Sequence, residues 1–346
     1  MPANHPPAEQ VQPRGSVMRD VARLAGVSHQ TVSRVLNDHP SVRDETRARV
    51  LSAMQQLNYR RNLAARTLAT RRSGTLGIIG FETTLFGPAS MLYGIEEAAR
   101  AAGYFVSIAT VQRPDRKSVL DAADRLIQQS VEGIIAIAPK PAVTSALLQV
   151  PATLACVGVG GGTDDDGVAA VRIDNAAGAR LATQHLLDLG HATVHHIAGP
   201  ADWPEAQERI EGWRSTLYAA RAVVPPVAPQ SWSAKSGYEQ GQVLAKDPSV
   251  TAIFCANDHL ALGLLRALHE AGRSVPQEVS VVGFDDMPES GYFLPPLTTV
   301  RQNFTELGRR SLGMLLEQIE LASGVRSTEH VLLNPELIVR TSSAAP

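Results

Sequence analysis

Apolar residues near the start of the chain recur three or four positions apart, which is the spacing of one face of an α-helix. The pattern predicts three short helices, with a tight turn at Gly26 between the first two, because glycine adopts a positive φ without steric penalty. The inward positions would be Val17, Val21, Leu24 and Ala25 in the first helix, Val32, Val35 and Leu36 in the second, and Val50, Leu51, Met54 and Leu57 in the third, over residues 46–57. We therefore expect a small all-α unit over about residues 16–60.

A different pattern begins at Thr75, where short apolar runs alternate with helical segments. The runs cover residues 75–81, 104–110, 133–138, 154–159, 169–173, 193–199, 251–256 and 279–284. Strands that alternate with helices predict parallel sheets covered by helices, so the fold class is an all-α head followed by an α/β body. The pattern alone fits one large lobe or two, and the length of the chain favours two.

The composition is typical of a globular cytoplasmic protein. The chain has 346 residues, 44% of them hydrophobic, and its two cysteines, Cys156 and Cys255, form no C-x-x-C pair. We therefore expect neither a disulfide framework nor a cysteine zinc site. Residues 1–15 contain four prolines and no apolar core, which indicates a disordered leader rather than a secretory signal. Prolines and glycines interrupt the uncharged stretch 141–163, so it is not expected to span a membrane.

The net charge of −2 hides an uneven distribution. Residues 1–72 carry +7, from 12 arginines and five carboxylates, whereas the remainder carries −9. A basic head on an acidic body is typical of a polyanion-binding module joined to a domain with another task, although a solvated charged face would show the same charges.

Two short helices joined by a glycine turn are typical of a helix-turn-helix, whose second helix enters the major groove of DNA; an ordinary helical hairpin is the alternative. Ser28 is placed to cap that second helix. The outward side chains suit base recognition, because arginine pairs with guanine and glutamine with adenine. We assign base reading to His29, Gln30 and Arg34, and phosphate contacts to Thr31, Ser33, Asn37 and Thr46.

Longer motifs connect these features. The run DVARLAGVSHQTVSRVLN at residues 20–37 is followed by VRDETRARV, LNYRRNLAARTLA and TLGIIG, and later by HLLDLGH, IAGP, RIEGW, WSAKSGY, ANDHLALG, VSVVGFDD and PPLTTVRQNF. Together they resemble the lac repressor family (LacI/GalR) of bacterial transcriptional regulators over about residues 16–340. The resemblance implies a helix-turn-helix DNA-binding domain at 16–60, a hinge helix and linker at 61–73, and an effector-binding and dimerisation body at 74–340.

The same resemblance implies a periplasmic-binding-protein-like body of two Rossmann-like lobes. Lobe 1 would comprise about residues 74–173 and 303–331, and lobe 2 about residues 174–301 and 332–343. The chain would cross between the lobes near Asp174, Arg301 and Leu332. A ligand would bind in the cleft at the carboxyl ends of the strands.

The segment before the body departs from the family pattern in two places. The chain reads Tyr59-Arg60-Arg61-Asn62 where the family commonly has Tyr-x-Pro-Asn, so entry to the hinge loses a fixed φ and gains a phosphate-seeking charge. Arg43 stands where the family usually has a hydroxyl residue, which leaves Asp44 as the expected cap of the third helix.

The hinge itself, residues 62–69, is too short for a stable helix in water, and a plain linker fits its composition equally well. The resemblance implies that the hinge folds on DNA. Asn62, Ala65 and Leu68 would then face the minor groove, with Leu68 levered between base steps.

Polar residues follow the predicted strands of lobe 2, where strand-end groups face the cleft. A carboxylate, a guanidinium and an amide can satisfy the hydroxyls of a sugar, and an aromatic face can cover its C–H surface. By position-wise resemblance the polar clamp is Arg209, Asn257 and Asp285, the apolar walls are Trp232 and Phe304, and further contacts come from Gly87, Pro88 and Gln302. The alternative is that Asp285 caps a helix and Trp232 fills the core.

Signals for catalysis or metal binding are weak. His195 and His196 are adjacent on a predicted strand and point to opposite faces, so they do not form a metal cluster with His191. The glycines at 158–162 lack phosphate-loop spacing, and Asp164-Asp165-Asp166 fits an acidic surface loop. With no paired nucleophile and base, we expect no enzyme activity, no cofactor and no metal.

These observations predict a cytoplasmic, sequence-specific DNA-binding repressor of sugar-utilisation genes. It would bind a pseudo-palindromic operator as a homodimer, with no membrane partner, and a sugar, with a galactoside as one candidate, would release it. A dimer is expected because the leucine heptad tail of tetrameric relatives is lacking. The alternatives are a corepressor that strengthens DNA binding and a sugar-metabolising enzyme with a fused DNA-binding head.

Overall fold

The computed structural model describes residues 16–36, 38–59, 72–113, 115–137, 141–161, 167–227, 230–321 and 327–346. The chain divides into two compact units, residues 1–72 and residues 73–346. Several predictions lie outside the described residues: the leader 1–15, Asn37, the hinge with Asn62, Ala65 and Leu68, and the loop Asp164-Asp165-Asp166.

The described residues of the first unit form three helices, as the sequence predicts. They are α1 (Met18–Ala25), α2 (His29–Leu36) and α3 (Asp44–Gln56). Gly26 ends α1 with a φ of 65°, so its positive φ makes the tight turn into α2. Val21, Val32 and Val50 are fully buried at the centre of the unit.

Part of the predicted core of this unit is wrong. Val17, Leu24 and Leu51 are 56%, 50% and 47% exposed, and the small side chains of Ala22 and Ala53 are buried instead. Short alanine side chains let these helices approach closely, which turns the bulkier neighbours outward. The expected cap is also wrong, because α3 begins at Asp44 and Arg43 occupies the cap position without a side-chain hydrogen bond. Asp44 and Glu45 lie in the first turn, where their negative charges interact favourably with the positive end of the helix dipole.

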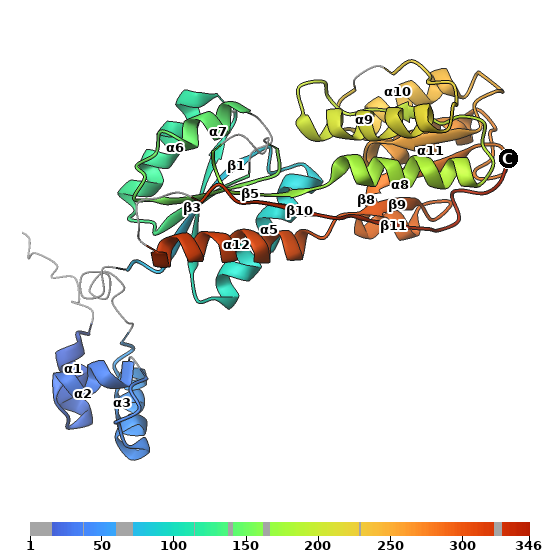
Figure 1. Ribbon diagram of the computed structural model, residues 1–346. Coiled ribbons are helices and arrows are strands. Elements are labelled where there is room, and N and C mark those ends of the chain that lie inside the picture. Colours follow the sequence, from blue (N-terminus) through green and yellow to red (C-terminus); the bar gives the residue numbers. More distant parts are fainter. Residues whose placement is uncertain are drawn as a thin grey trace, which may run out of the picture. The chain divides into compact units, whose positions relative to one another are not determined.

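The described strands of the second unit form two sheets, one in each lobe. The sheet of lobe 1 has the strand order β10-β5-β4-β3-β1-β2, and every described pair in it is parallel. Its strands are β1 (Thr75–Phe81), β2 (Phe105–Val111), β3 (Gly133–Ile137), β4 (Ala155–Val159), β5 (Ala170–Ile173) and β10 (His330–Leu333). Helices α6 (Arg116–Gln128) and α7 (Pro141–Leu147) cover one face, and α5 (Phe86–Ala101) and α12 (Phe304–Leu321) cover the other (Figure 1).

The sheet of lobe 2 has the order β11-β9-β8-β7-β6, in which only the β11–β9 pair is antiparallel among the described strands. Its strands are β6 (His195–Ile197), β7 (Ala252–Cys255), β8 (Ser280–Asp285), β9 (Thr298–Arg301) and β11 (Glu336–Ile338). Helices α8 (Asn175–Asp188) and α9 (Pro204–Ala219) pack on one face, and α10 (Ala234–Leu244) and α11 (Asp258–Glu270) on the other, with a short 3-10 helix, η1 (Pro288–Tyr292), after β8. The predicted class, parallel sheets covered by helices, is confirmed.

Helices α10 and α11 lie unusually close together on lobe 2. A Cβ on Gly237 would overlap the carbonyl of Leu260, and a Cβ on Gly263 would overlap the carbonyl of Ala234. Glycine at these two positions therefore allows the helix backbones to touch, which holds the α11 N-terminus firmly beside the carboxyl end of β7.

In the part of the chain that the structure describes, three segments connect the lobes. The chain passes from β5 to α8 at Asp174, from β9 to α12 at residues 302–303, and from β10 to β11 at residues 334–335 (Figure 1). The third crossing follows Leu332, which itself pairs with β5 in lobe 1. Because these three segments cross between the same two lobes, the lobes can change their relative orientation only if all three segments move together. No helix among the described residues has the length and apolar character of a membrane span.

Candidate functional site

The exposed face of α2 is the candidate surface for DNA. His29, Gln30 and Arg34 are exposed, on the side of α2 opposite the buried Val32 and Val35. The sequence predicted these three side chains as base readers, and the fold leaves all of them accessible.

The start of α2 is fixed by its predicted cap. The Ser28 hydroxyl oxygen accepts a hydrogen bond of 3.1 Å from the Thr31 backbone N–H, and the two hydroxyls lie 2.9 Å apart. The cap satisfies an N–H at the start of the helix and so orients its first turn. Ser33 and Thr46, which the sequence predicts to contact phosphates, are half-buried.

The second unit contains a cavity between the two lobes, with about 780 Å³ of non-atom space, part of which is open to solvent. Aromatic and aliphatic side chains and a few buried polar groups line it, as is typical of small-molecule sites. Lobe 1 contributes Leu85, Phe86, Gly87, Pro88, Met91, Ile137, Val159, Gly160, Gly161, Arg172 and Ile173, and lobe 2 with its crossings contributes Asn175, Trp203, Glu205, Glu208, Arg209, Trp232, Asn257, His259, Asp285 and Gln302.

The fold brings together seven of the eight residues that the sequence placed at the cleft. These are Gly87, Pro88, Arg209, Trp232, Asn257, Asp285 and Gln302. Phe304 is not among the lining residues, and its ring packs edge-on against Phe86 with a centroid distance of 6.0 Å. Phe86 therefore stands between Phe304 and the cavity.

Arg209 is the centre of the polar cluster. It is 5% exposed, its Nε donates to Asn175 Oδ1 over 2.9 Å, and its Nη1 donates to the carbonyl of Ala256. The guanidinium also lies 3.7 Å from the ring centroid of Phe284. These contacts hold the buried guanidinium in one orientation, whereas an arginine at the surface would be free to change its orientation.

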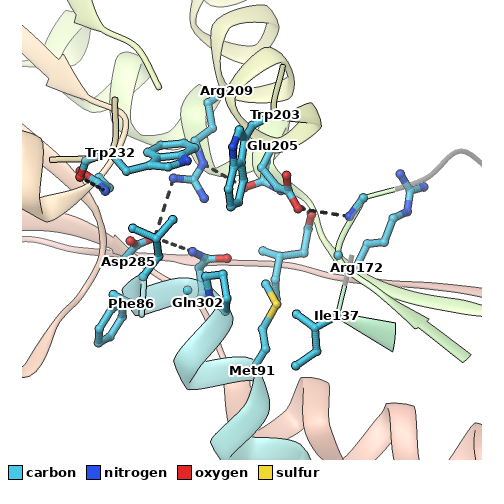
Figure 2. Close-up of a pocket in the computed structure, with 18 of the residues that line it drawn as sticks. Phe86, Met91, Ile137, Arg172, Trp203, Glu205, Arg209, Trp232, Asp285 and Gln302 are labelled. Atoms are coloured by element: carbon cyan, nitrogen blue, oxygen red, sulfur yellow. Dashed lines mark hydrogen bonds and ion pairs between the residues drawn. The ribbon is translucent and has the colours of Figure 1, made fainter. Parts of the chain in front are cut away.

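Asp285 faces this cation. Its Oδ1 lies 3.7 Å from Arg209 Nη1 and accepts a hydrogen bond of 2.6 Å from Gln302 Nε2 (Figure 2). Burial raises the pKa of Asp285 to about 7, although the Arg209 charge acts in the opposite direction. Guanidinium, carboxylate and amide thus converge on one wall of the cavity, and they can donate to and accept from the same polyhydroxyl ligand.

Asp285 is not a helix cap in this structure. It ends strand β8, and the 3-10 helix η1 that follows has Met287 in its cap position. Asn257 has that role instead, because its Oδ1 accepts a hydrogen bond of 2.8 Å from Leu260 N–H at the start of α11. Its Nδ2 donates to the carbonyl of Trp232 over 3.2 Å, so Asn257 also positions that aromatic wall.

Several residues of the cavity were missed by sequence reasoning. Trp203 packs edge-on against Trp232, with centroids 5.6 Å apart, and contacts Phe81 of lobe 1 at 6.0 Å. Glu205 and Glu208 come from the first turns of α9, immediately after Trp203. The signal that could have found them is the Trp-Pro-Glu start of a helix that follows a strand end, since such helix N-termini lie at the cleft edge of an α/β sheet.

His196 is buried among aromatic side chains in lobe 2. His196 stacks on Phe254 at a centroid distance of 4.7 Å, and its Nδ1–H donates to the Phe254 carbonyl. Burial lowers the pKa of His196 to about 4. Across the described part of the chain, no group of three or more His, Cys, Asp or Glu side chains is arranged to hold a metal ion.

A basic helix-turn-helix followed by a two-lobed body with a preorganised polar cleft defines a DNA-binding regulator controlled by a small ligand. Comparison with known families agrees with this class. Residues 17–62 match the family described as bacterial regulatory proteins, lacI family, and residues 183–343 match the periplasmic binding protein-like domain.

Curated relatives extend the match over nearly the whole chain. The chain is 35% identical to the lactose operon repressor of Escherichia coli (strain K12), over 94% of this chain and 90% of that protein. It is 32% identical to the HTH-type transcriptional repressor PurR of Haemophilus influenzae (strain PittEE), over 94% of this chain and 98% of that protein. The chain belongs to the lacI family of bacterial regulatory proteins, a family of transcriptional regulators and not of enzymes.

Solved structures show the same architecture. A crystal structure of the lac repressor dimer bound to operator and the anti-inducer ONPF matches with a TM-score of 0.82 and 32% identity, covering 96% of this chain and 100% of that chain. A complex of the transcriptional regulator CelR with cellobiose matches with a TM-score of 0.69 and 30% identity, covering 94% of this chain and 99% of that chain. The predicted combination of a helix-turn-helix head with a periplasmic-binding-protein-like body is therefore confirmed.

Proposed function

We propose that this protein is a cytoplasmic repressor that binds a pseudo-palindromic operator as a homodimer and leaves it when a sugar occupies the cleft between its lobes. The observation that carries the proposal is the buried cluster of Arg209, Asp285 and Gln302 at the cavity wall. An ion pair and a hydrogen bond among these groups hold them in place, which lowers the ordering cost when a polyhydroxyl ligand binds.

The DNA half of the proposal rests on α2. His29, Gln30 and Arg34 would read base edges, while Ser28, Thr31, Ser33 and Thr46 would fix the helix against phosphates. Asn37 and the hinge residues Asn62, Ala65 and Leu68 complete the proposed DNA contacts. Two copies of one head present two identical helices, so a dimer fits two half-sites one helical turn apart.

The ligand half rests on the cavity. Arg209 and Asp285 would bind hydroxyl groups, Asn257 would hold the Trp232 segment and add an amide, and Trp232 would cover the apolar face of the sugar ring. The relatives support a sugar, because one of the matching regulators is described as a complex with cellobiose. A galactoside is one candidate for this sugar.

The coupling between sugar binding and DNA binding would run through the three segments that cross between the lobes. Gln302, which holds Asp285, belongs to the crossing between β9 and α12. A sugar that rearranges the Asp285 contacts would therefore act on the segment that sets the lobe orientation, and with it on the hinge at the start of the body. Coupling free energies of this kind are about 1–3 kcal/mol.

A gel-shift assay tests the proposal. Purified protein is titrated onto palindromic fragments from its own promoter region and onto random duplex, with and without neutral sugars. We expect preferential binding to a palindrome and release by one sugar. Equal binding to all duplexes contradicts the DNA half, and a small molecule that strengthens binding, or is converted to product, contradicts release by a sugar effector.

A further inference from the structure

Glu205 is a buried carboxylate that bridges the two lobes. It lies in the first turn of α9 in lobe 2, is 9% exposed and lines the cavity. Its Oε1 accepts a hydrogen bond of 3.2 Å from the backbone N–H of Gly161, which follows β4 in lobe 1 (Figure 2). Within the described residues, its other oxygen, Oε2, is buried and has no hydrogen-bond partner.

The neighbouring backbone leaves room for this carboxylate. Gly160 has a φ of +71°, and a Cβ at that position would lie 3.1 Å from Glu205 Oε1. A side chain there would be strained and would crowd the oxygen that bonds Gly161. The glycine pair thus forms a lobe 1 cradle for a carboxylate that comes from lobe 2.

The other charges of the cavity have partners. Arg209 faces Asp285 at 3.7 Å, and Arg172 faces Glu208 at 3.6 Å. Glu208 also accepts a hydrogen bond of 3.1 Å from Asn175. Glu205 is the lining carboxylate for which the described residues provide no ion pair, so it leaves the cavity with an excess of negative charge.

A buried acceptor without a partner is costly, and a ligand that donates to it removes the cost. A sugar hydroxyl meets this need, because it donates one hydrogen bond and brings no charge. A phosphate or carboxylate group would place a second negative charge beside the buried Glu205 carboxylate, which is unfavourable. Burial also raises the pKa of Glu205 to about 7, which shows how poorly the present surroundings stabilise its charge.

We propose that Glu205 is a specificity-determining residue, which accepts a hydrogen bond from a hydroxyl group of the effector and makes the cleft select uncharged sugars over phosphorylated sugars. Since its Oε1 is bound to Gly161, a hydroxyl on Oε2 is linked to both lobes at once. The inference rests on the proposed function, because it concerns the effector that this function requires.

A purely structural role makes a different prediction. If Glu205 only joined the lobes, Glu205→Gln would keep this role, because its amide oxygen can still accept from the Gly161 N–H and its volume is nearly the same. Discrimination between neutral and phosphorylated sugars would then stay unchanged. A loss of discrimination in Glu205→Gln, together with a loss of affinity for the neutral sugar, would therefore show that the ligand interacts with the Glu205 carboxylate itself.

The test uses the full chain at about pH 8, where the carboxylate is mostly ionised. Glucose, galactose, ribose, lactose and cellobiose are titrated, each monosaccharide paired with its phosphorylated form, and binding is followed by tryptophan fluorescence and by release of operator DNA. The variants are Glu205→Gln, Glu205→Ala as a second variant of different size, and the control Glu211→Gln, which lies on the exposed side of the same helix. Thermal melts compare their folding.

We expect the wild type to bind one neutral sugar at least about tenfold more tightly than its phosphorylated form, and Glu205→Gln to lose about tenfold in affinity for that sugar and most of the discrimination. Glu211→Gln should match the wild type. The inference is overturned if a folded Glu205 variant keeps both affinity and discrimination, or if the wild type prefers a phosphorylated sugar. If no sugar binds or releases the operator, the proposed function fails first, and the inference fails with it.

Discussion

Gln302 donates a hydrogen bond of 2.6 Å to Asp285, and this bond joins the end of strand β8 to the segment that crosses between the lobes. Asp285 lines the cavity, whereas Gln302 leads directly into α12 of lobe 1. A ligand that competes for the Asp285 carboxylate therefore changes a contact of the crossing itself. This arrangement gives the cleft a short physical route to lobe orientation.

Replacing Asp285 separates ligand response from DNA binding. In Asp285→Asn the charge that faces Arg209 is lost, so we expect the affinity for the sugar to fall by about tenfold to a hundredfold. Operator binding without sugar should stay within about twofold of wild type, because the amide oxygen of the variant can still accept the Gln302 hydrogen bond that holds the crossing. Fluorescence titration and gel shift measure the two quantities. Asp188→Asn, at an exposed position, is the control, and a variant that released operator normally would show that Asp285 does not bind effector.

Arg34 tests the assignment of the base readers. Arg34→Ala should cost about 1–3 kcal/mol of operator affinity and relax the sequence preference at one base pair, because a bidentate arginine reads a guanine. Binding to a set of operators with single substitutions measures the preference. Arg23→Ala, at an exposed arginine of α1 outside the proposed contacts, is the control, and it should leave the base preference unchanged. An unchanged base preference in Arg34→Ala would assign this arginine to phosphate instead.

The hinge prediction concerns Leu68. Leu68→Ala should lower operator affinity, because the wedge that offsets the cost of kinking the DNA is shortened, while sugar affinity stays unchanged. Both affinities are measured on the same preparation. Operator binding equal to wild type would remove Leu68 from the proposed contacts.

His196 predicts a pH-dependent stability. Its folded-state pKa of about 4 lies below the ordinary value of 6.5, so the unfolded chain binds more protons between these values and the contribution of His196 to stability is lost as the pH falls. His196→Gln keeps a donor for the Phe254 carbonyl but does not titrate. Denaturant unfolding at about pH 7 and pH 5 should show a smaller acid-induced loss in the variant than in the wild type. An identical loss in both proteins would exclude His196 as a source of the pH dependence.

The fold was largely predictable because its strands are continuous apolar runs. Each of the eight predicted runs overlaps a strand. Apart from the edge strand β2, these strands are mostly buried, as strands covered on both faces of a parallel sheet are. Strands β9, β10 and β11 have weaker signals: β9 contains the buried Thr298 and Thr299, and β10 and β11 are only partly buried. Their place in the sheets depends on tertiary pairing.

The cleft was predicted in part, for a physical reason. Asp285 and Asn257 stand at strand ends, where position in the sequence indicates position in the sheet. Glu205 lies on a helix, and its partner Gly161 is 44 residues away in the other lobe, so no local pattern connects them. Phe304 was predicted to line the cavity because it stands at a crossing. Its ring packs against Phe86 instead, and Phe86 lines the cavity in its place.

The central claim is that one chain couples an operator to a sugar, and linkage tests it most directly. Operator affinity is measured with and without saturating sugar, and sugar affinity with and without saturating operator. The account predicts that both affinities fall by the same factor, about 5- to 150-fold. Two affinities that do not depend on each other would contradict it.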